Sequence, residues 1–377
     1  MLTPPVYVDD DHSLRAVIDQ LARERLIAVD TESNSLHAYR ERVCLIQIST
    51  RSADYIIDPL TIGDLSPLAP LFEDSAIEKV FHAAEYDVMC LKRDYGFRFN
   101  RLFDTMIAAR VCGIKQIGLG NLLGDLAGVQ VDKSHQRDNW GQRPLPPDSL
   151  AYAQMDTHFL PALRDHLAER LNALNRAEMA RELFDDLCQS RAAHQQFDPD
   201  GFWKIAAQHH LSPRETSVLR ELYLWRESVA EKRDLPPFKV LHDKALVALA
   251  AEQPRQLSEL MNLQGVGGGN GRRYGRDLLR VIERGRAAQP PSAPPPEEPT
   301  DPRLVEIYSA LRDWRKERAA ALEVESDVII ARDVLWAIAE RMPRTLDDLR
   351  AIPGMRQWRW EAYGEELLKV IQRWQKR

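Results

Sequence analysis

The chain has 377 residues, of which 44% are hydrophobic and 29% are charged, and it carries a formal net charge of −6. This length predicts two or three domains, and the composition is that of a soluble globular protein rather than of a disordered chain. No uncharged apolar stretch approaches the ~18 residues of a membrane-spanning helix. The first residues lack the pattern of a signal peptide. The sequence therefore predicts a protein without a membrane partner.

The distribution of cysteine and of charge narrows the class of protein further. The four cysteines are scattered and form no Cys-x-x-Cys pair, which predicts reduced thiols in a cytoplasmic protein and argues against a zinc site. Residues 1–190 contain 20 Lys and Arg against 29 Asp and Glu, whereas residues 191–377 contain 31 against 28. An acidic front half is expected where carboxylates bind metal ions, and a weakly basic rear half would help to hold a polyanion.

In the front half, short strands are expected before and between helices. We expect strands at residues 6–8, 26–29, 43–49, 55–59 and 79–82. Apolar residues at helical spacing predict a helix over residues 11–21, and the turn that precedes residue 55 predicts a hairpin. Helical patterns dominate from residue 83 onward. This order favours a mixed sheet covered by helices, an α/β architecture.

The strand at residues 26–29 continues directly into Asp30 and Glu32. Side chains at positions i and i+2 of an extended chain point to the same side, so these two carboxylates are expected to project together. Two like charges at such a distance repel each other unless a cation or a shared proton lies between them. A metal site is one interpretation, and an ordinary pair of solvated or helix-capping acids is the other.

Three later residues have the chemistry to complete such a site. Asp87 opens the predicted helix that follows the strand at residues 79–82. Tyr152 and Asp156 are spaced i and i+4 in a predicted helix, so they share one of its faces. Each also has an ordinary structural interpretation, Asp87 as an acid at a helix start and Tyr152 as a packing ring.

Taken together, these residues resemble the motifs of the DEDD family of 3′→5′ exonucleases. The segment 29–32 resembles the first motif, the segment 82–87 resembles the second, and Tyr152-x-x-x-Asp156 resembles the third in its tyrosine form. The resemblance implies a ribonuclease H-like fold for an exonuclease domain at residues 1–195. Any single motif is weak, but the order and spacing of all three fit the family.

The resemblance also implies the chemistry of the site. Two divalent ions, Mg²⁺ or Mn²⁺, would activate water and stabilise the leaving 3′ oxygen, and carboxylates are suitable ligands for such hard ions. Asp30 would bridge both ions, Glu32 and Asp156 would help to bind the water-activating ion, and Asp87 would act on the other ion mainly through water. Tyr152 would orient the attacking water.

Two neighbouring residues have competing interpretations. His82 is a candidate for lining the substrate cleft, but a hydrogen-bonded structural histidine at a strand end is the favoured interpretation. Asp104 precedes a predicted helix that begins at Thr105, which favours a helix-capping role over a role in the active site.

The rear half contains an internal repeat. Residues 222–282 align without gaps with residues 311–371 at a constant offset of 89. Trp225-Arg226 thereby matches Trp314-Arg315, and Gly265 matches Gly354. Self-similarity of this kind predicts one helical module that occurs twice. A proline-rich linker at residues 289–302 separates the two copies.

Each copy resembles the HRDC domain, a helical module that assists nucleic-acid binding. The resemblance implies all-α helical-bundle domains at residues 208–288 and 303–377, each of four to five short helices. Residues 235–240 of the first copy fit the family well, whereas Glu325-Ser326-Asp327 of the second copy departs from it and makes RNA binding by that copy doubtful. Candidates for phosphate contacts in the first copy are Arg272, Arg273 and Arg276, with a plain solvated helix face as the alternative.

These features predict a metal-dependent 3′→5′ exoribonuclease that trims structured RNA and releases 5′-mononucleotides. The resemblance implies tRNA precursors and other structured RNAs with a free 3′ end as substrates, and we expect a monomer. A 3′→5′ DNA exonuclease is one alternative, because nothing in the motifs reads a 2′-hydroxyl group. A non-catalytic RNA-binding scaffold is the other, and the complete set of acidic residues argues against it.

Overall fold

The computed structural model describes residues 2–129, 134–192, 196–266, 269–295 and 301–375. The chain forms two compact units. Unit 1 consists of Met1–Glu32, Val43–Ala193 and Glu298–Arg377, and unit 2 consists of Ser33–Arg42 and His194–Glu297. The division assigns the two repeats to different units. It also assigns ten residues of the front half to the unit that contains the first repeat.

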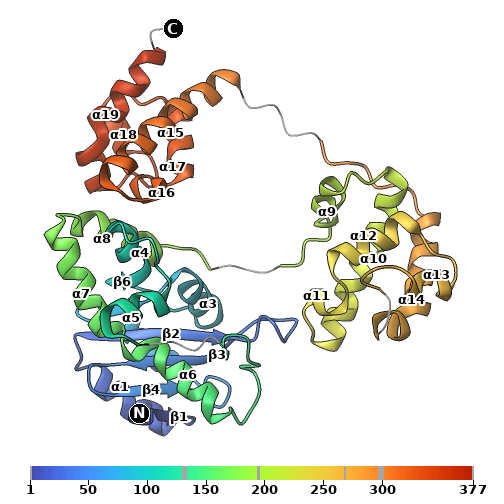
Figure 1. Cartoon of the computed structure of the whole chain (residues 1–377), viewed down its shortest axis with the longest axis horizontal. Coiled ribbons are helices and arrows are strands. Elements are labelled where there is room, and N and C mark those ends of the chain that lie inside the picture. Colours follow the sequence, from blue (N-terminus) through green and yellow to red (C-terminus); the bar gives the residue numbers. More distant parts are fainter. Residues whose placement is uncertain (1, 130–133, 193–195, 267–268, 296–300, 376–377) are drawn as a thin grey trace. The chain divides into compact units, whose positions relative to one another are not determined.

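Unit 1 contains a mixed sheet with the strand order β1-β4-β3-β2-β5-β6 (Figure 1). The strands are β1 (Val6–Val8), β2 (Leu26–Ser33), β3 (Val43–Ser49), β4 (Asp54–Ile57), β5 (Glu78–Phe81) and β6 (Leu102–Asp104). β3 and β4 form the expected antiparallel hairpin, whereas β1 and β4, β2 and β5, and β5 and β6 pair in parallel. The predicted α/β architecture is confirmed. β2 is longer than expected, because it continues beyond Val29 through both acids to Ser33.

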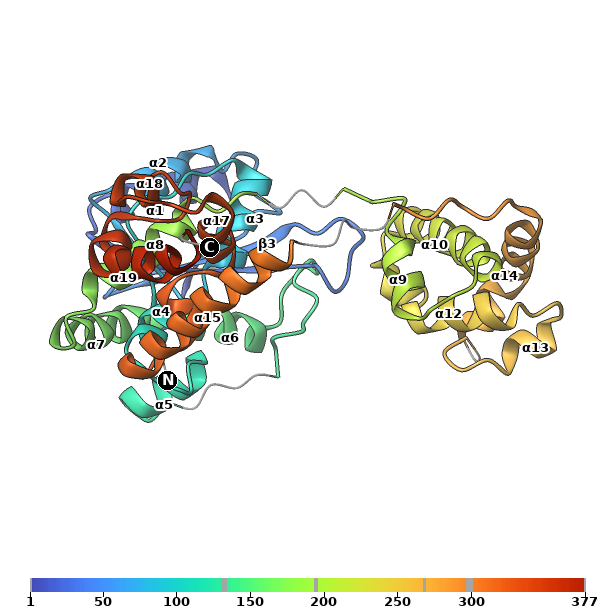
Figure 2. The ribbon, with the colours of Figure 1, turned by 90° about the horizontal axis from the view of Figure 1, so that it is seen from above.

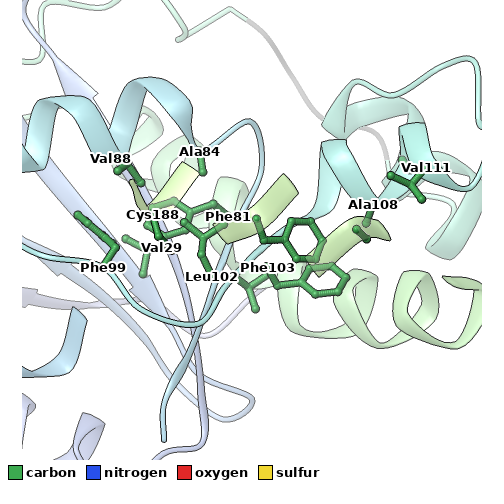
Figure 3. Close-up of a cluster of buried hydrophobic side chains, with 14 of the residues drawn as sticks. Val29, Phe81, Ala84, Val88, Phe99, Leu102, Phe103, Ala108, Val111 and Cys188 are labelled. Carbon is green, nitrogen blue, oxygen red and sulfur yellow. The ribbon is translucent and has the colours of Figure 1, made fainter. Parts of the chain in front are cut away.

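Helices cover this sheet. They are α1 (Asp11–Leu21), a 3₁₀ turn η1 (Ser66–Leu68), α2 (Ala69–Glu73), α3 (Glu85–Tyr95), α4 (Thr105–Val111), α5 (Leu119–Ala127), α6 (Pro147–His158), α7 (Leu160–Ala173) and α8 (Ala177–Cys188). α6 packs against β3 and β4, α3 packs against β3, and α8 packs against β6. Val29, Phe81 and Val88 belong to one buried cluster with Phe103 of β6, Ala108 of α4 and Cys188 of α8 (Figure 3). This packing fixes α3 and α6 against the sheet whose strand β2 carries Asp30 and Glu32.

The repeat predicted from the sequence is confirmed helix by helix. The first copy consists of α10 (Pro213–Arg233), α11 (Pro237–Val240), α12 (Asp243–Glu252), α13 (Leu257–Met261) and α14 (Gly269–Ala287). The second consists of α15 (Pro302–Leu322), α16 (Ser326–Ile329), α17 (Arg332–Arg341), α18 (Leu346–Arg350) and α19 (Gln357–Gln375). Gly265 and Gly354, one in each copy, have φ angles of 81° and 83°, which explains why glycine occurs at both places. Of the predicted linker 289–302, residues 296–300 lie outside the described part of the chain.

In unit 2, α10 packs against α12 and α14, as Figures 1 and 2 both show. A further helix, α9 (Phe202–Gln208), begins before residue 208, which is the start of the domain predicted from the sequence. Phe202 is fully buried in the same core, so α9 is part of this unit. Every helix in the described residues is too short or too polar to cross a membrane.

In unit 1, the second copy and the exonuclease sequence share one hydrophobic core. α19 packs on α8, where Arg359 is 3% exposed and donates to Asp186 at 3.0 Å. The backbone N–H of Trp358 donates to Glu182 of α8. The second copy is therefore a packed part of unit 1.

Candidate metal centre

Three carboxylates converge at one place in unit 1. Asp30 and Glu32 come from β2, and Asp156 comes from α6. One oxygen from each of these three side chains lies within 4.8 Å of the others, a group that could hold a metal ion. Hard divalent ions such as Mg²⁺ prefer oxygen donors of this kind, so the donor set fits the metal expected from the sequence. The alternation of side chains along β2 and the packing of α6 on β3 and β4 explain the convergence.

Asp87 lies beside this group and is attached to the same strand. Its Oδ1 accepts hydrogen bonds from the backbone N–H of Thr31 at 3.1 Å and from the Thr31 hydroxyl at 2.5 Å. Thr31 is the residue between Asp30 and Glu32, and Asp87 is 6% exposed. The first turn of α3 is therefore held against β2 at the acidic pair. This explains why a residue 57 positions after Asp30 belongs to the same site.

Burial and mutual repulsion oppose ionisation of these carboxyls. Burial, followed by the charges of Asp87, Asp156 and Glu32, raises the pKa of Asp30 well above its usual range. The pKa values of the other three are raised by burial first, with repulsion from neighbouring acids adding to it. A divalent cation would reverse this effect, because its charge favours the ionised carboxylates. The arrangement is electrostatically unfavourable without a cation and suited to one.

Tyr152 faces the acids from α6. It lies one turn before Asp156 and donates its hydroxyl hydrogen bond to that carboxylate. Burial, and then the charges of Asp156 and Glu32, raise the pKa of the phenol above its ordinary value. The hydroxyl therefore stays protonated at neutral pH. It can orient a water molecule or a phosphate oxygen, but it is a poor base.

A segment that contains His135, Asp138 and Trp140 completes this side of the site. The rings of His135 and Trp140 lie with their centroids 6.2 Å from that of Tyr152. Asp138 accepts from Ser149 Oγ at 2.6 Å and lies 2.8 Å from His135 Nδ1. The charge of Asp138 also contributes to the raised pKa of Glu32. No signal in the sequence places His135 or Asp138 here, because neither occurs at a fixed spacing from the four acids.

Arg143 anchors this segment to the sheet. Its guanidinium donates to both carboxylate oxygens of Asp58, which is fully buried, and to the backbone oxygens of Cys44 and Trp140. Tyr7 donates to the same Asp58 carboxylate at 2.6 Å. This network holds the segment that contains Trp140 in place beside Tyr152.

His82 and Asp104 organise the turn that leads into α3. Asp104 caps α4 by accepting from the backbone N–H of Ile107, and it also accepts from Ala84 at 2.6 Å. The predicted structural role of Asp104 is confirmed. His82 Nδ1 lies 2.9 Å from Thr105 Oγ1, and burial lowers the pKa of the imidazole to about 4. His82 is therefore neutral and hydrogen-bonded.

The three arginines proposed from the sequence lie elsewhere. Arg272, Arg273 and Arg276 are exposed residues of α14 in unit 2, whereas the acidic group lies in unit 1. Their predicted role in phosphate contacts stays a prediction.

The fold and the acidic site define a 3′→5′ exonuclease domain followed by two HRDC domains. The 3′-5′ exonuclease family matches residues 5–172, and the HRDC domain family matches residues 215–282 and 305–371.

Relatives along the whole chain make the assignment narrower. The chain is 29% identical to ribonuclease D of Acidiphilium cryptum, covering 97% of this chain and 93% of that protein. It is 30% identical to ribonuclease D of Gluconacetobacter diazotrophicus, covering 97% and 92%. The crystal structure of Escherichia coli RNase D has the same fold, with a TM-score of 0.68, 24% identity and coverage of 98% and 99%. The chain belongs to the ribonuclease D family and is a 3′→5′ exoribonuclease, which confirms the predicted activity.

Proposed function

We propose that the protein hydrolyses the terminal phosphodiester bond of RNA with two divalent ions, Mg²⁺ or Mn²⁺, and releases 5′-mononucleotides. The convergence of the carboxylates of Asp30, Glu32 and Asp156 within 4.8 Å carries this proposal. Bound divalent ions would supply a water of lowered pKa and would stabilise the leaving oxygen. The raised pKa values of these carboxyls support it, because a site that resists ionisation by itself gains most from a cation.

Each residue has a distinct proposed role. Asp30 would be the ligand that the ions share, because its carboxylate interacts with the charges of the other three acids. Glu32 and Asp156 complete the water-activating position, and Asp87, whose Oδ1 is already occupied by Thr31, contributes mainly through water. Tyr152 holds the attacking water through its protonated hydroxyl.

We propose tRNA precursors and other structured RNAs with a free 3′ end as substrates of a monomeric enzyme. The proposed domains are the exonuclease at residues 1–195 and the HRDC domains at residues 208–288 and 303–377, with the linker at residues 289–302. Phosphate contacts are assigned to the exposed arginines of α14, Arg272, Arg273 and Arg276. In this proposal His82 supports the substrate cleft without contacting the RNA, because its imidazole is neutral and hydrogen-bonded to Thr105.

The test is product analysis on an end-labelled tRNA precursor with Mg²⁺, with Mn²⁺ and with EDTA. We expect 5′-mononucleotides with either metal, and none with EDTA or with Asp30→Asn. Asp19→Asn, which changes an exposed acid of α1, is the matched control and should retain full activity. Full activity in EDTA would contradict the metal assignment. Preference for a matched DNA oligomer would contradict the substrate assignment.

A further inference from the structure

The two HRDC domains share a corner at the end of their first long helix. In the first domain Asp234 follows the last residue of α10, and in the second Glu323, 89 positions later, follows the last residue of α15. Both residues have left-handed backbone conformations, with φ angles of 49° and 55°, and a short helix follows each of them. We call the last turns of the first long helix together with the residues that follow it, residues 227–239 and 316–328, the helix-end corners of the two domains.

The helix-end corner of the second domain lies against the end of α4. The Arg110 guanidinium donates to Glu325 at 2.7 Å and to Asp327 at 2.6 Å. Gly113 follows α4, and a Cβ atom at this position would lie 2.9 Å from the backbone oxygen of Glu323. The corner therefore combines a forked ion pair with a close approach of two backbones.

A second arginine joins the same two elements. Arg176 donates to the backbone oxygen of Val111, at the end of α4, at 2.8 Å. It also donates to the backbone oxygen of Leu322, at the end of α15, at 2.9 Å. One guanidinium thus binds the last turns of two helices that are distant in sequence.

The helix-end corner of the first domain also holds a piece of the exonuclease sequence, within unit 2. The Tyr39 backbone N–H donates to Asp234 Oδ1 at 3.0 Å, and the Tyr39 hydroxyl donates to Glu227 at 2.5 Å. Arg40 pairs with Glu231 at 3.3 Å. The Tyr39 ring packs against the hydrophobic core of the domain. The contact is therefore built from backbone, hydroxyl, charge and apolar surface together.

The held segment connects β2 to β3. Asn34 closes this loop, since its side-chain oxygen accepts from the Arg42 N–H at 2.9 Å and its backbone oxygen accepts from His37 and Ala38. The loop begins after Ser33, the residue that follows Glu32. A displacement of this loop therefore acts on the end of β2 next to Glu32, one of the acidic group.

Charge argues that these corners bind protein rather than RNA. The contacting side chains of the first corner are three acids, Glu227, Glu231 and Asp234, and one base, Lys239, which lies 3.4 Å from His37 Nδ1. Those of the second corner are Glu325 and Asp327. Carboxylates repel the phosphate backbone, whereas arginine and tyrosine donors satisfy them. The departure of Glu325-Ser326-Asp327 from the first copy thereby acquires a physical reason, because it supplies both carboxylates that bind Arg110.

We propose that the helix-end corner is a docking surface with which each HRDC domain binds the exonuclease sequence. The second domain uses it to bind the end of α4, and the first uses it to bind residues 37–40. Through this contact the first domain positions Glu32. Tyr39 and Asp234 are positioning residues, and RNA contacts of the first domain lie on another face.

Hydrogen exchange of the full-length protein tests the docking without reference to activity. In Asp234→Ala we expect exchange of the Tyr39 amide to accelerate more than tenfold, because the substitution removes its acceptor. Exchange at His37 and Ala38 should change less, since Asn34 remains their acceptor. The control is Glu283→Ala, an exposed acid of α14, which should leave the loop unchanged. Equal exchange of the Tyr39 amide in Asp234→Ala and wild type would overturn the proposal.

A charge exchange tests the second corner. Arg110→Glu should accelerate exchange in α16, and the triple variant with Glu325→Arg and Asp327→Arg should restore protection, because the ion pairs re-form with reversed sign. Failure of the triple variant to recover any protection would contradict docking through this corner.

The effect on Glu32 rests on the proposed metal site and has a separate readout. Tyr39→Ala should weaken Mn²⁺ binding about three- to tenfold, as measured by electron paramagnetic resonance. It should also lower kcat on a short oligomer with little change in KM, and Tyr39→Phe should recover part of both. Unchanged Mn²⁺ affinity together with accelerated loop exchange would show docking without positioning. Absence of Mn²⁺ binding in the wild type would instead contradict the proposed function.

Discussion

Replacing Asp30 with Asn should stabilise the metal-free protein while abolishing its activity. Asp30, Glu32 and Asp156 have oxygens within 4.8 Å of one another. Two unit charges at this distance repel by about 3 kcal/mol at the effective dielectric constant of about 20 that suits protein sites. Proton uptake relieves part of this repulsion, so we expect Asp30→Asn to raise the Tm in EDTA at pH 8 by about 3–6 °C.

Differential scanning calorimetry with EDTA, and with saturating Mn²⁺, measures this effect. The difference should change sign with Mn²⁺, because the wild type gains binding energy that the variant lacks. Asp19→Asn should leave the Tm unchanged under both conditions, since Asp19 is exposed on α1. A Tm in EDTA that is unchanged or lower in Asp30→Asn would refute the repulsion argument.

The same carboxyls predict a dependence on pH. The pKa values of Asp87 and Asp156 are raised to about 7, chiefly by burial. The folded protein therefore retains protons that the unfolded chain releases near pH ~4, and the metal-free protein should lose stability as the pH rises from about 4 to above 7. Saturating Mn²⁺ should remove most of this loss.

Three further changes have definite expected outcomes. Tyr152→Phe should lower kcat about tenfold or more, because the attacking water is no longer positioned. The affinity for Mn²⁺ should not change. Normal turnover of this variant would remove the hydroxyl from the mechanism. Changing Arg272, Arg273 and Arg276 together to Gln should weaken binding to structured RNA and reduce the slope of log K against log salt by about 1 for each phosphate that these arginines neutralise. A slope equal to that of the wild type would assign them to a plain solvated face. Deleting residues 301–377 should impair short-oligomer and structured-RNA cleavage alike, because the second HRDC domain shares the core of unit 1; an impairment confined to structured RNA would contradict that shared core.

Much of the site could be predicted because local geometry fixes it. The alternation of side chains along an extended chain placed Asp30 and Glu32 together, and the i, i+4 spacing placed Tyr152 above Asp156. The constant offset of 89 revealed the duplicated domain, whose helices recur at matching positions. Each of these conclusions depends on residues within one element or on self-similarity, and both are properties of the sequence alone.

Tertiary packing decided the remainder. Asp87 reaches β2 through Thr31. His135, which is paired with Asp138, reaches Tyr152 because Arg143 anchors their segment on buried Asp58. The sequence predicted the acids of the candidate metal centre and the repeated domain. Only the tertiary structure decided that the two copies belong to different units, each holding a different piece of the exonuclease sequence. The reason is physical, since spacing fixes the face on which a side chain lies within its own element, whereas contacts between distant elements depend on how their surfaces pack.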